Sequence, residues 1–261
     1  MAEMTNKQAE YWAGRLSDVT NGNIKDAELR IKNYYKHSMK RVIADFEATY
    51  DKVLVAVGND RVPTPADLYN LDKYYQMQAQ LRDELNMLGD KESALLSKKF
   101  ESQYNGIYRL FSNSSFSTVN RADVLNMAWA PDGIHWSKRI WGNTAKLADM
   151  LDKELIDCVI TGKKTSFLRK RLIEAFGTSY SNVDRLVRTE MAYIQTQASK
   201  NAMIEDGVEY YEFFADPDER TCPVCGALDG KRFKTSEMKP GVNATPMHPR
   251  CACCVLPVVR E

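Results

Sequence analysis

The chain has 261 residues, of which 44% are hydrophobic and 27% are charged, enough for one large globular domain or two moderate ones. The formal net charge of +1 gives no reason to expect a general attraction to nucleic acid or to an anionic membrane. The opening MAEMTNKQAEYW has no signal-peptide pattern and no apolar run could span a bilayer, so we expect a reducing compartment and no membrane partner.

The first predicted element is a long amphipathic helix. From Ile24 to Val53 the apolar residues recur at spacings of three, four or seven, which predicts a helix that buries one face. Thr64 and Pro65 then have the residue types of a helix start. This pattern predicts a bundle or an extended arm of long helices with short breaks.

Two glycines set the expected limits of the next helices. The helix that begins at Pro65 is predicted to end at Gly89, with an apolar stripe that includes Tyr75. A third helix is expected over residues 90–111, weakened near its end by Gly106. The polar stretch SNSSFSTVN at 112–120 is then the predicted domain boundary, which divides the chain into 1–115 and 116–261.

The second domain is expected to be helical to about residue 207 and to carry a small sheet over 208–261. One helix is predicted to close at Gly177, and the next is predicted to be capped by Asn182 and to end before Gly207. VEYYEFF then has the β-branched and aromatic residues of a strand. ALDGKRF predicts a hairpin in which Asp229 and Gly230 form a two-residue turn.

The expected fold class is therefore mainly α. A helical N-terminal arm or bundle precedes a smaller α+β C-terminal domain with a metal-clasped β-hairpin.

Cysteines provide the strongest chemical signal in the sequence. Cys222 and Cys225 have C-x2-C spacing, and His248, Cys251 and Cys253 follow the hairpin candidate. Thiolate and imidazole ligands in a reducing compartment favour a tetrahedral zinc site. The alternatives are a reduced thiol cluster without a metal and a partly disulfide-bonded one, and five donors compete for four positions.

A structural zinc site is favoured over a catalytic one. Catalytic zinc keeps one position open, and the zinc deaminases carry an H-x-E element before the cysteine pair. Neither His37 nor His135 begins such an element, and Cys158 has the apolar surroundings of a core residue. We therefore expect no enzymatic activity and no catalytic residues.

A dense basic run, KKTSFLRKR, is the one candidate for contact with DNA. It could add an affinity for phosphate that depends on salt but not on base sequence, although without interleaved aromatic residues a solvated helix face is the favoured explanation. The basic residues concerned are Lys163, Lys164, Arg169, Lys170 and Arg171.

Four motifs in a fixed order resemble the Mu F-like head morphogenesis family of tailed bacteriophages, the phage minor head proteins. They are GIHWSKRIWGNT, RLVRTEMAYIQTQASKNA, DPDERTCPVCGALDGKRF and HPRCAC, and the resemblance runs from about Trp129 onward. Ala252 stands where the family often has arginine, and Cys254 is an additional thiol. Both differences leave the fourth metal ligand open.

The resemblance implies which residues carry the family pattern. The metal pattern falls on the five Cys and His donors already named. The remaining motif residues, in the helix and the turn, are Arg188, Thr189, Glu190, Asn201, Leu228, Asp229 and Gly230.

The resemblance also implies a location and partners. It implies a low-copy protein of the virion head interior or portal vertex, made in the host cytoplasm, that contacts the portal and major capsid proteins. Such a protein would assist head assembly and the packaging or delivery of DNA. The alternative is a zinc-stabilised protein that binds packaged or ejected DNA.

Overall fold

The computed structural model describes residues 5–58, 61–112, 118–216 and 221–258. The chain forms two compact units, and each is built from separate stretches of sequence. Unit 1 comprises Met1–Glu28, Leu95–Trp136 and Asp184–Glu261, whereas unit 2 comprises Leu29–Ala94 and Ser137–Val183. The domain boundary predicted between residues 115 and 116 lies outside the described residues and stays a prediction.

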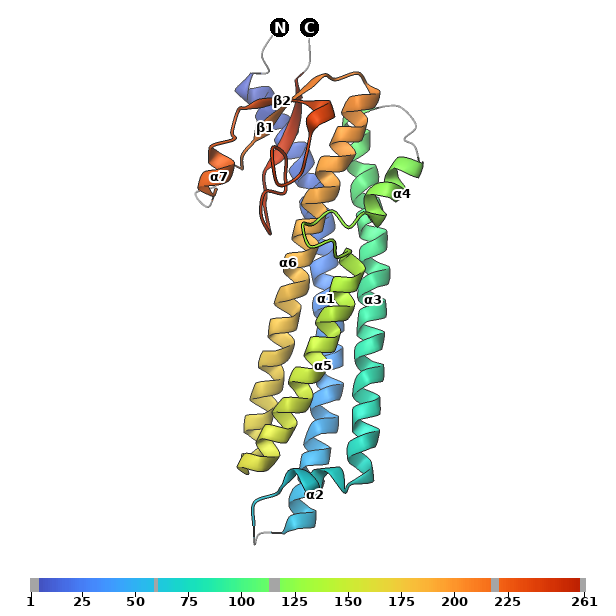
Figure 1. The fold of residues 1–261 in the computed structure, drawn as a ribbon, viewed down its shortest axis with the longest axis vertical. Helices are drawn as coiled ribbons and strands as arrows, with labels where there is room; N and C mark the ends of the chain where they lie inside the picture. The colour runs from blue at the N-terminus through green and yellow to red at the C-terminus, as the bar shows by residue number, and fades with distance from the viewer. Residues whose placement is uncertain (1–4, 59–60, 113–117, 217–220, 259–261) are drawn as a thin grey trace. The chain divides into compact units, whose positions relative to one another are not determined.

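The prediction of a mainly helical chain is confirmed (Figure 1). Among the described residues, no helix has a stretch long and apolar enough to cross a membrane. The helices that precede the first strand are α1 (Asn6–Val57), α2 (Pro65–Tyr69), α3 (Asp72–Phe111), α4 (Thr118–Asn126), α5 (Trp136–Thr161) and α6 (Thr165–Glu205).

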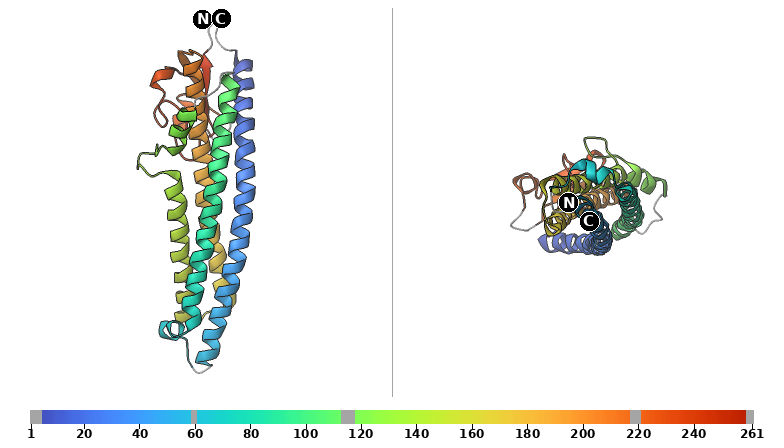
Figure 2. Two further views of the ribbon diagram at one scale, coloured as in Figure 1. Left: turned by 90° about the vertical axis from the view of Figure 1, so that its right-hand side faces the viewer. Right: turned by 90° about the horizontal axis from the view of Figure 1, so that it is seen from below.

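In unit 2, parts of α1, α3, α5 and α6 run side by side around an apolar core (Figures 1 and 2). The stripe predicted for the first helix is confirmed, because most of its members are buried. The core residues include Ile31, Val42, Phe46, Tyr50 and Val53 of α1, Leu81, Leu85 and Leu88 of α3, Leu147, Leu151 and Leu155 of α5, and Leu168 and Leu172 of α6.

A polar layer interrupts this core. The hydroxyl of Tyr35 lies 2.9 Å from the Ser179 hydroxyl, and the Asn143 amide donates to both, at 3.2 Å and 2.7 Å. Glu92 lies close to Tyr35 and is fully buried, yet neither of its carboxyl oxygens has a hydrogen-bond partner among the described residues. The Ser38 hydroxyl is likewise buried without a partner. Unit 2 therefore contains an ionisable group in a largely apolar environment.

The start of α2 is as predicted, but the helix that follows is interrupted. Thr64 caps α2 by accepting the backbone N–H of Asp67, with Pro65 at the first helical position. The helix stops after Tyr69 and α3 begins at Asp72, so that Tyr74 is buried next to the break. Tyr75, predicted to face the core, is therefore 60% exposed.

The prediction that Gly89 ends a helix is wrong, because α3 continues through it. A Cβ atom at this position would lie 2.8 Å from Cζ3 of Trp141, so the glycine allows the indole ring to pack against the helix backbone. Gly106 serves the same purpose, since its Cβ would lie 2.8 Å from Cγ1 of Val19. Close packing therefore explains both glycines.

Alanine at Gly89 should consequently lower the melting temperature. The gain in helix propensity is about 1 kcal/mol, but displacement of the Trp141 ring costs about 1–3 kcal/mol. Gly177→Ala is the matched control, since a Cβ there would meet no described atom within 4 Å outside the neighbouring turns of its own helix, and it should raise the melting temperature. Calorimetry of both variants measures the difference, and equal stabilisation by the two would contradict this packing role.

The helix predicted to close at Gly177 and the one predicted to begin at Asn182 are a single helix, α6. Asn182 does not cap a helix, since its amide donates to the side-chain oxygen of Asn143 at 3.3 Å. Tertiary contacts have thus overridden the local propensity of both residues. The predicted end of the helix before Gly207, which has φ of 70°, is confirmed.

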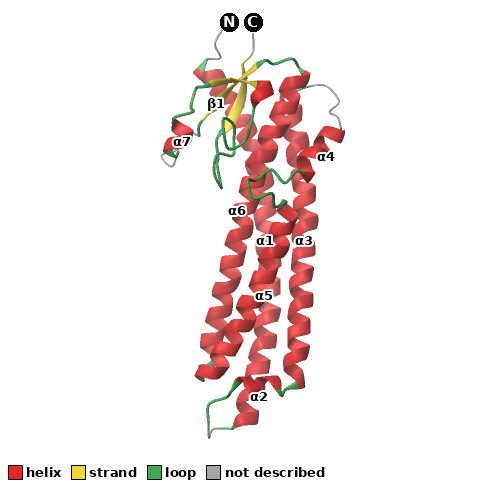
Figure 3. Cartoon of the chain, viewed as in Figure 1, coloured by secondary structure: helices red, strands yellow, loops and turns green. Residues whose placement is uncertain are grey.

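Unit 1 contains a small sheet, drawn in yellow in Figure 3. It is antiparallel and has three strands in the order β2-β1-β3. The strands are β1 (Tyr210–Phe214), β2 (Arg232–Lys234) and β3 (Cys254–Val258). The predicted strand over VEYYEFF is confirmed, and so is the two-residue turn at Asp229 and Gly230, since the backbone N–H of Lys231 donates to the carbonyl of Leu228 at 3.0 Å. The hairpin pairing is wrong, because β2 pairs with β1 rather than with residues 227–228. The segment between β1 and β2 instead contains the cysteine turn.

The buried face of β1 connects the sheet to its surroundings. Tyr211 packs in a cluster with Met203 of α6 and Val255. Phe213, two residues along the same face, packs in a cluster with Cys225 and other cysteines. The sheet therefore holds the cysteines beside its own apolar face.

Candidate metal centre

The first half of the candidate centre is the turn from Cys222 to Cys225. These residues form the start of the short helix α7 (Pro223–Gly226), in which Cys222 is the N-cap and proline occupies the first turn. The sulfur of Cys222 accepts a hydrogen bond from the backbone N–H of Cys225 at 3.4 Å. Because proline and the cap fix this turn, both sulfurs can face one point.

The second half is an irregular segment before β3. The backbone N–H of Cys251 donates to the carbonyl of His248 at 3.2 Å, across a turn in which Arg250 has φ of 62°. The Nδ1 atom of His248 lies 3.0 Å from the carbonyl oxygen of Pro249. A carbonyl can only accept, so Nδ1 carries the proton and Nε2 presents its lone pair.

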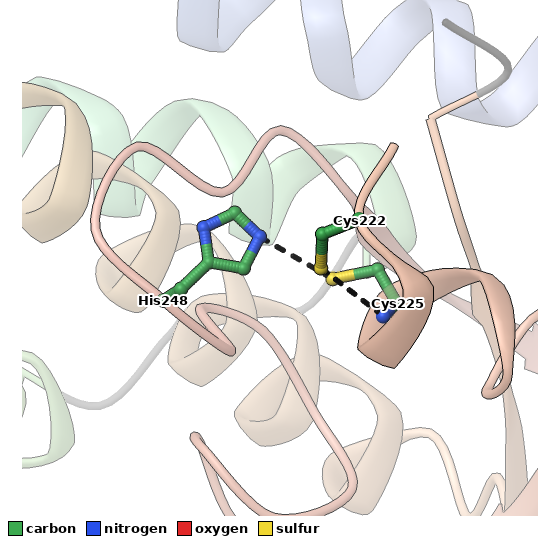
Figure 4. A group of neighbouring side chains, drawn as sticks. All are labelled: Cys222, Cys225 and His248. Carbon is green, nitrogen blue, oxygen red and sulfur yellow. Dashed lines mark hydrogen bonds between the residues drawn. The ribbon is translucent and has the colours of Figure 1, made fainter. Parts of the chain in front are cut away.

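The two halves meet at Cys225 (Figure 4). Its sulfur lies 3.5 Å from Nε2 of His248 and 3.9 Å from the sulfur of Cys251. Usual bond lengths at a tetrahedral zinc ion place a nitrogen and a sulfur about 3.6 Å apart and two sulfurs about 3.8 Å apart. The ligand atoms of Cys222, Cys225 and His248 all lie within 4.8 Å of one another. These separations fit a zinc ion.

The two remaining cysteines differ in their positions. Cys253 forms a second group with Cys225 and Cys251, again with all sulfurs within 4.8 Å, and its sulfur accepts the backbone N–H of Asp216 at 3.4 Å. Cys254 belongs to β3 and to neither group. Burial raises the pKa of Cys254 to about 12. The additional thiol therefore lies outside the two groups of possible ligands.

The pKa values of the sulfurs are shifted in both directions. A hydrogen bond from Cys253, together with other polar contacts, lowers the pKa of Cys251 to about 5. The backbone N–H of Cys225 lowers the pKa of Cys222, whereas burial raises the pKa of Cys225 to about 12. Thiolates are the metal ligands, so Cys225 would release its proton when a metal binds.

Three consecutive residues of α6 hold separate segments of unit 1 together. The Thr189 hydroxyl accepts the backbone N–H of Arg250 at 3.1 Å, which fixes the segment that carries His248 and Cys251. The carboxylate of Glu190 accepts the indole N–H of Trp129 at 2.9 Å. These contacts give the predicted motif a structural role.

Asp184 is a member of this group that the sequence did not suggest. One of its carboxylate oxygens lies 3.3 Å from Nε of Arg188, and the other lies 2.5 Å from a guanidinium nitrogen of Arg250. Arg188 also pairs with Glu28 of α1. The spacing of four residues between Asp184 and Arg188 is a recognisable helical ion pair, but nothing local connects Arg188 with Glu28.

The other motif residues stabilise the fold. The amide of Asn201 donates to the hydroxyl of Tyr104 at 2.9 Å. The carboxylate of Asp229 accepts the backbone N–H of Ala215 at 2.8 Å, and Gly230 has φ of 70°. Asp229 and Gly230 thus support the turn that returns the chain to β2.

The basic run lies in unit 2 and is partly neutralised. Arg169 forms an ion pair with Glu47 at 2.6 Å, and Arg171 forms one with Glu154 at 2.7 Å. All of the basic side chains predicted as possible DNA contacts are exposed, namely Lys163, Lys164, Arg169, Lys170 and Arg171.

Comparison with known proteins gives one finding. Residues 149–256 match the family model described as Phage Mu protein F like protein. This range contains both halves of the candidate centre and the Arg188–Glu190 motif, but it begins after the tryptophan motif near Trp136. No curated protein and no solved structure matches the chain. Over this range the chain is similar to the Mu F-like phage proteins, a family that suggests phage head morphogenesis and a virion location.

Proposed function

We propose that this chain is a structural minor head protein of a tailed phage. The observation that carries the proposal is the Mu F-like match over residues 149–256. In this role the chain associates with the portal or the inner capsid surface and assists head assembly and the packaging or delivery of DNA. Its partners are the portal protein and the major capsid protein.

Zinc is the proposed cofactor, in a closed structural site. We assign the four ligands to Cys222, Cys225, His248 and Cys251. Cys225 contacts both His248 and Cys251, and these two share a short turn, whereas the sulfur of Cys253 accepts the N–H of Asp216. Four protein ligands leave no position for a substrate, which supports a non-enzymatic protein.

Direct DNA binding is the weaker proposal. Lys163, Lys164 and Lys170 would supply it, since the guanidinium groups of Arg169 and Arg171 are engaged by carboxylates. A real contact should weaken steeply as salt increases and should be reduced when Lys170 is neutralised.

Co-purification with assembled heads tests the proposed function. The full chain is produced with the portal and major capsid proteins of a phage that encodes it, and the heads are isolated by sedimentation. We expect the chain to sediment with heads in a few copies, and heads made without it to form in lower yield or to package less DNA. Heads made without the portal protein distinguish a portal contact from an inner-capsid contact.

Equal yield and equal packaging with and without the chain would contradict the assembly role. Failure of the chain to sediment with heads of either kind would contradict the virion location.

A further inference from the structure

A cleft with a volume of about 520 Å³ lies within unit 1, beside the candidate metal centre. Its walls are one face of α1, part of α6 and the segment from Arg250 to Cys254. This volume lies in the range of sites that enclose a ligand. Cys251, a proposed zinc ligand, lies in its wall, but no role assigned so far uses the space itself.

The wall formed by α1 is long and has small side chains. It extends from Glu10 to Ile24 and includes Ala13, Gly14 and Ser17, with Ala192 contributed by α6. Fourteen residues of helix span about 21 Å. An extended peptide of six residues has nearly the same length, about 20 Å. Small side chains allow the backbone of such a peptide to approach closely.

Some of the polar groups in the wall are fixed by their neighbours. The hydroxyl of Thr20 donates to the side-chain oxygen of Gln195 at 2.6 Å and accepts from the amide of Gln103 at 2.7 Å. The amide of Asn21 donates to the Ser17 hydroxyl at 2.7 Å. These bonds hold the wall in one arrangement before any ligand arrives, which reduces the entropy cost of binding.

One end of the cleft carries two guanidinium groups. Arg188 and Arg250 both line it, with side chains that are 39% and 47% exposed, and the single carboxylate of Asp184 holds them side by side. Arg250 has a left-handed backbone conformation, which is unfavourable for a residue other than glycine. Glu28 also pairs with Arg188, so each guanidinium keeps exposed N–H donors beside carboxylates that hold it in place.

The other end of the cleft carries an exposed carboxylate. Glu10 lies eighteen residues before Glu28 on the same helix, a distance of about 27 Å along the axis. Asp216 adds a second carboxylate to the wall. The two ends therefore differ in charge, and the acidic groups disfavour a nucleic-acid strand, which is negative along its whole length.

We propose that this cleft binds an extended segment of a partner polypeptide that places an acidic side chain between Arg188 and Arg250 and a basic one beside Glu10. Arginine is suited to this role because its planar group binds carboxylates through two hydrogen bonds. The inference rests on the proposed function only in taking the partner to be another head protein.

Fluorescein-labelled hexapeptides test the proposal directly with the full chain. Asp-Ala-Ser-Ala-Ser-Lys and Lys-Ala-Ser-Ala-Ser-Asp cover both chain directions, and Asn-Ala-Ser-Ala-Ser-Gln is the uncharged control. By fluorescence anisotropy, one of the charged peptides should bind at least tenfold more tightly than the control. Arg250→Gln and Glu10→Gln should each remove most of this preference, whereas Asp18→Asn, an exposed position of α1 outside the cleft, should not.

Arg250→Gln could disturb the nearby cysteine segment. Glu10→Gln then still tests the proposal, because Glu10 is exposed and far from that segment in sequence. Equal binding of charged and uncharged peptides would overturn the proposal, as would unchanged binding by both variants. Displacement of the peptide by a short DNA strand, with a steep salt dependence, would assign the cleft to nucleic acid instead. Neither result depends on whether the chain enters phage heads, so the two proposals can fail separately.

Discussion

Replacing Cys225 with serine should abolish zinc binding and lower the free energy of unfolding of unit 1 by roughly 4 kcal/mol or more. The sulfur of Cys225 is the atom shared by both groups of possible ligands, so no rearrangement within the turn can replace it. The same residue also packs against Phe213 beside the sheet. The loss should therefore extend from the metal to β1 and β3.

The measurement is metal content under reducing conditions, combined with hydrogen exchange of the strand amides. Wild-type chain should hold close to one zinc per molecule, and the variant none, with fast exchange in the sheet. Cys158→Ala is the control, because Cys158 is a buried cysteine of unit 2 and should leave both readings unchanged. Wild-type chain without zinc would sink the metal assignment.

The fourth ligand can be identified in the same experiment. Cys251→Ser should lose zinc, whereas Cys253→Ser should retain it with at most a modest loss of affinity. The reverse pattern would assign the fourth ligand position to Cys253, and Cys251 would then be a nearby cysteine that does not bind zinc.

The Glu92→Gln variant should be more stable than the wild type at pH 8 by about 2–4 kcal/mol. Burial raises the pKa of Glu92 from its ordinary value of 4.5 to about 8. The groups around it are Tyr35, which is the titratable neighbour, and the neutral Asn143 and Ser179 near the Tyr35 hydroxyl. No cation among these groups compensates an ionised Glu92.

The expected pH dependence follows from proton binding in the two states. Below about pH 4.5 Glu92 is protonated both in the folded and in the unfolded chain, and its charge costs nothing. Between about 4.5 and 8 the unfolded chain has lost this proton while the folded chain retains it, so folding takes up a proton. Stability should then fall as pH rises, by up to about 1.4 kcal/mol per pH unit. Above about pH 8 this contribution is constant.

Urea unfolding of both chains across pH 4 to 9 measures the slope. Glu84→Gln is the matched control, since Glu84 is also a buried glutamate of α3 but forms an ion pair with Arg41 at 3.1 Å. This control should keep the slope and lose a little stability at neutral pH. If Glu92→Gln has the same slope as the wild type, Glu92 is not the group responsible.

Periodicity predicted the long helices well, because the bundle buries one face of each. Ile31, Phe46 and Tyr50 are buried as the spacing required. Sequence patterns failed where a residue was selected for a tertiary contact rather than for the local secondary structure. Gly89 has the residue type of a helix end, but it is needed for contact with Trp141, which lies in another helix. No local pattern contains that information.

The candidate site shows the same limit. The Cys and His spacing predicted which donors gather, and the structure places their ligand atoms in two groups of three that share Cys225. The choice between Cys251 and Cys253 could not be made from spacing, because it depends on the turn at Arg250 and on the N–H of Asp216. The cleft also left no trace in the sequence, since its walls come from four separate segments of the chain.

The interleaving of the two units has a consequence for the newborn chain. During synthesis, residues 1–28 emerge first, but residues 184–261, which complete unit 1, emerge only after every residue of unit 2. At ordinary ribosomal speeds this delay is on the order of ten seconds. The early turns of α1, with the apolar Leu16, must therefore remain without their neighbours from residues 184–261 while unit 2 can already close. The early turns of α1 can be covered completely only after the cysteine-bearing segment has been synthesised.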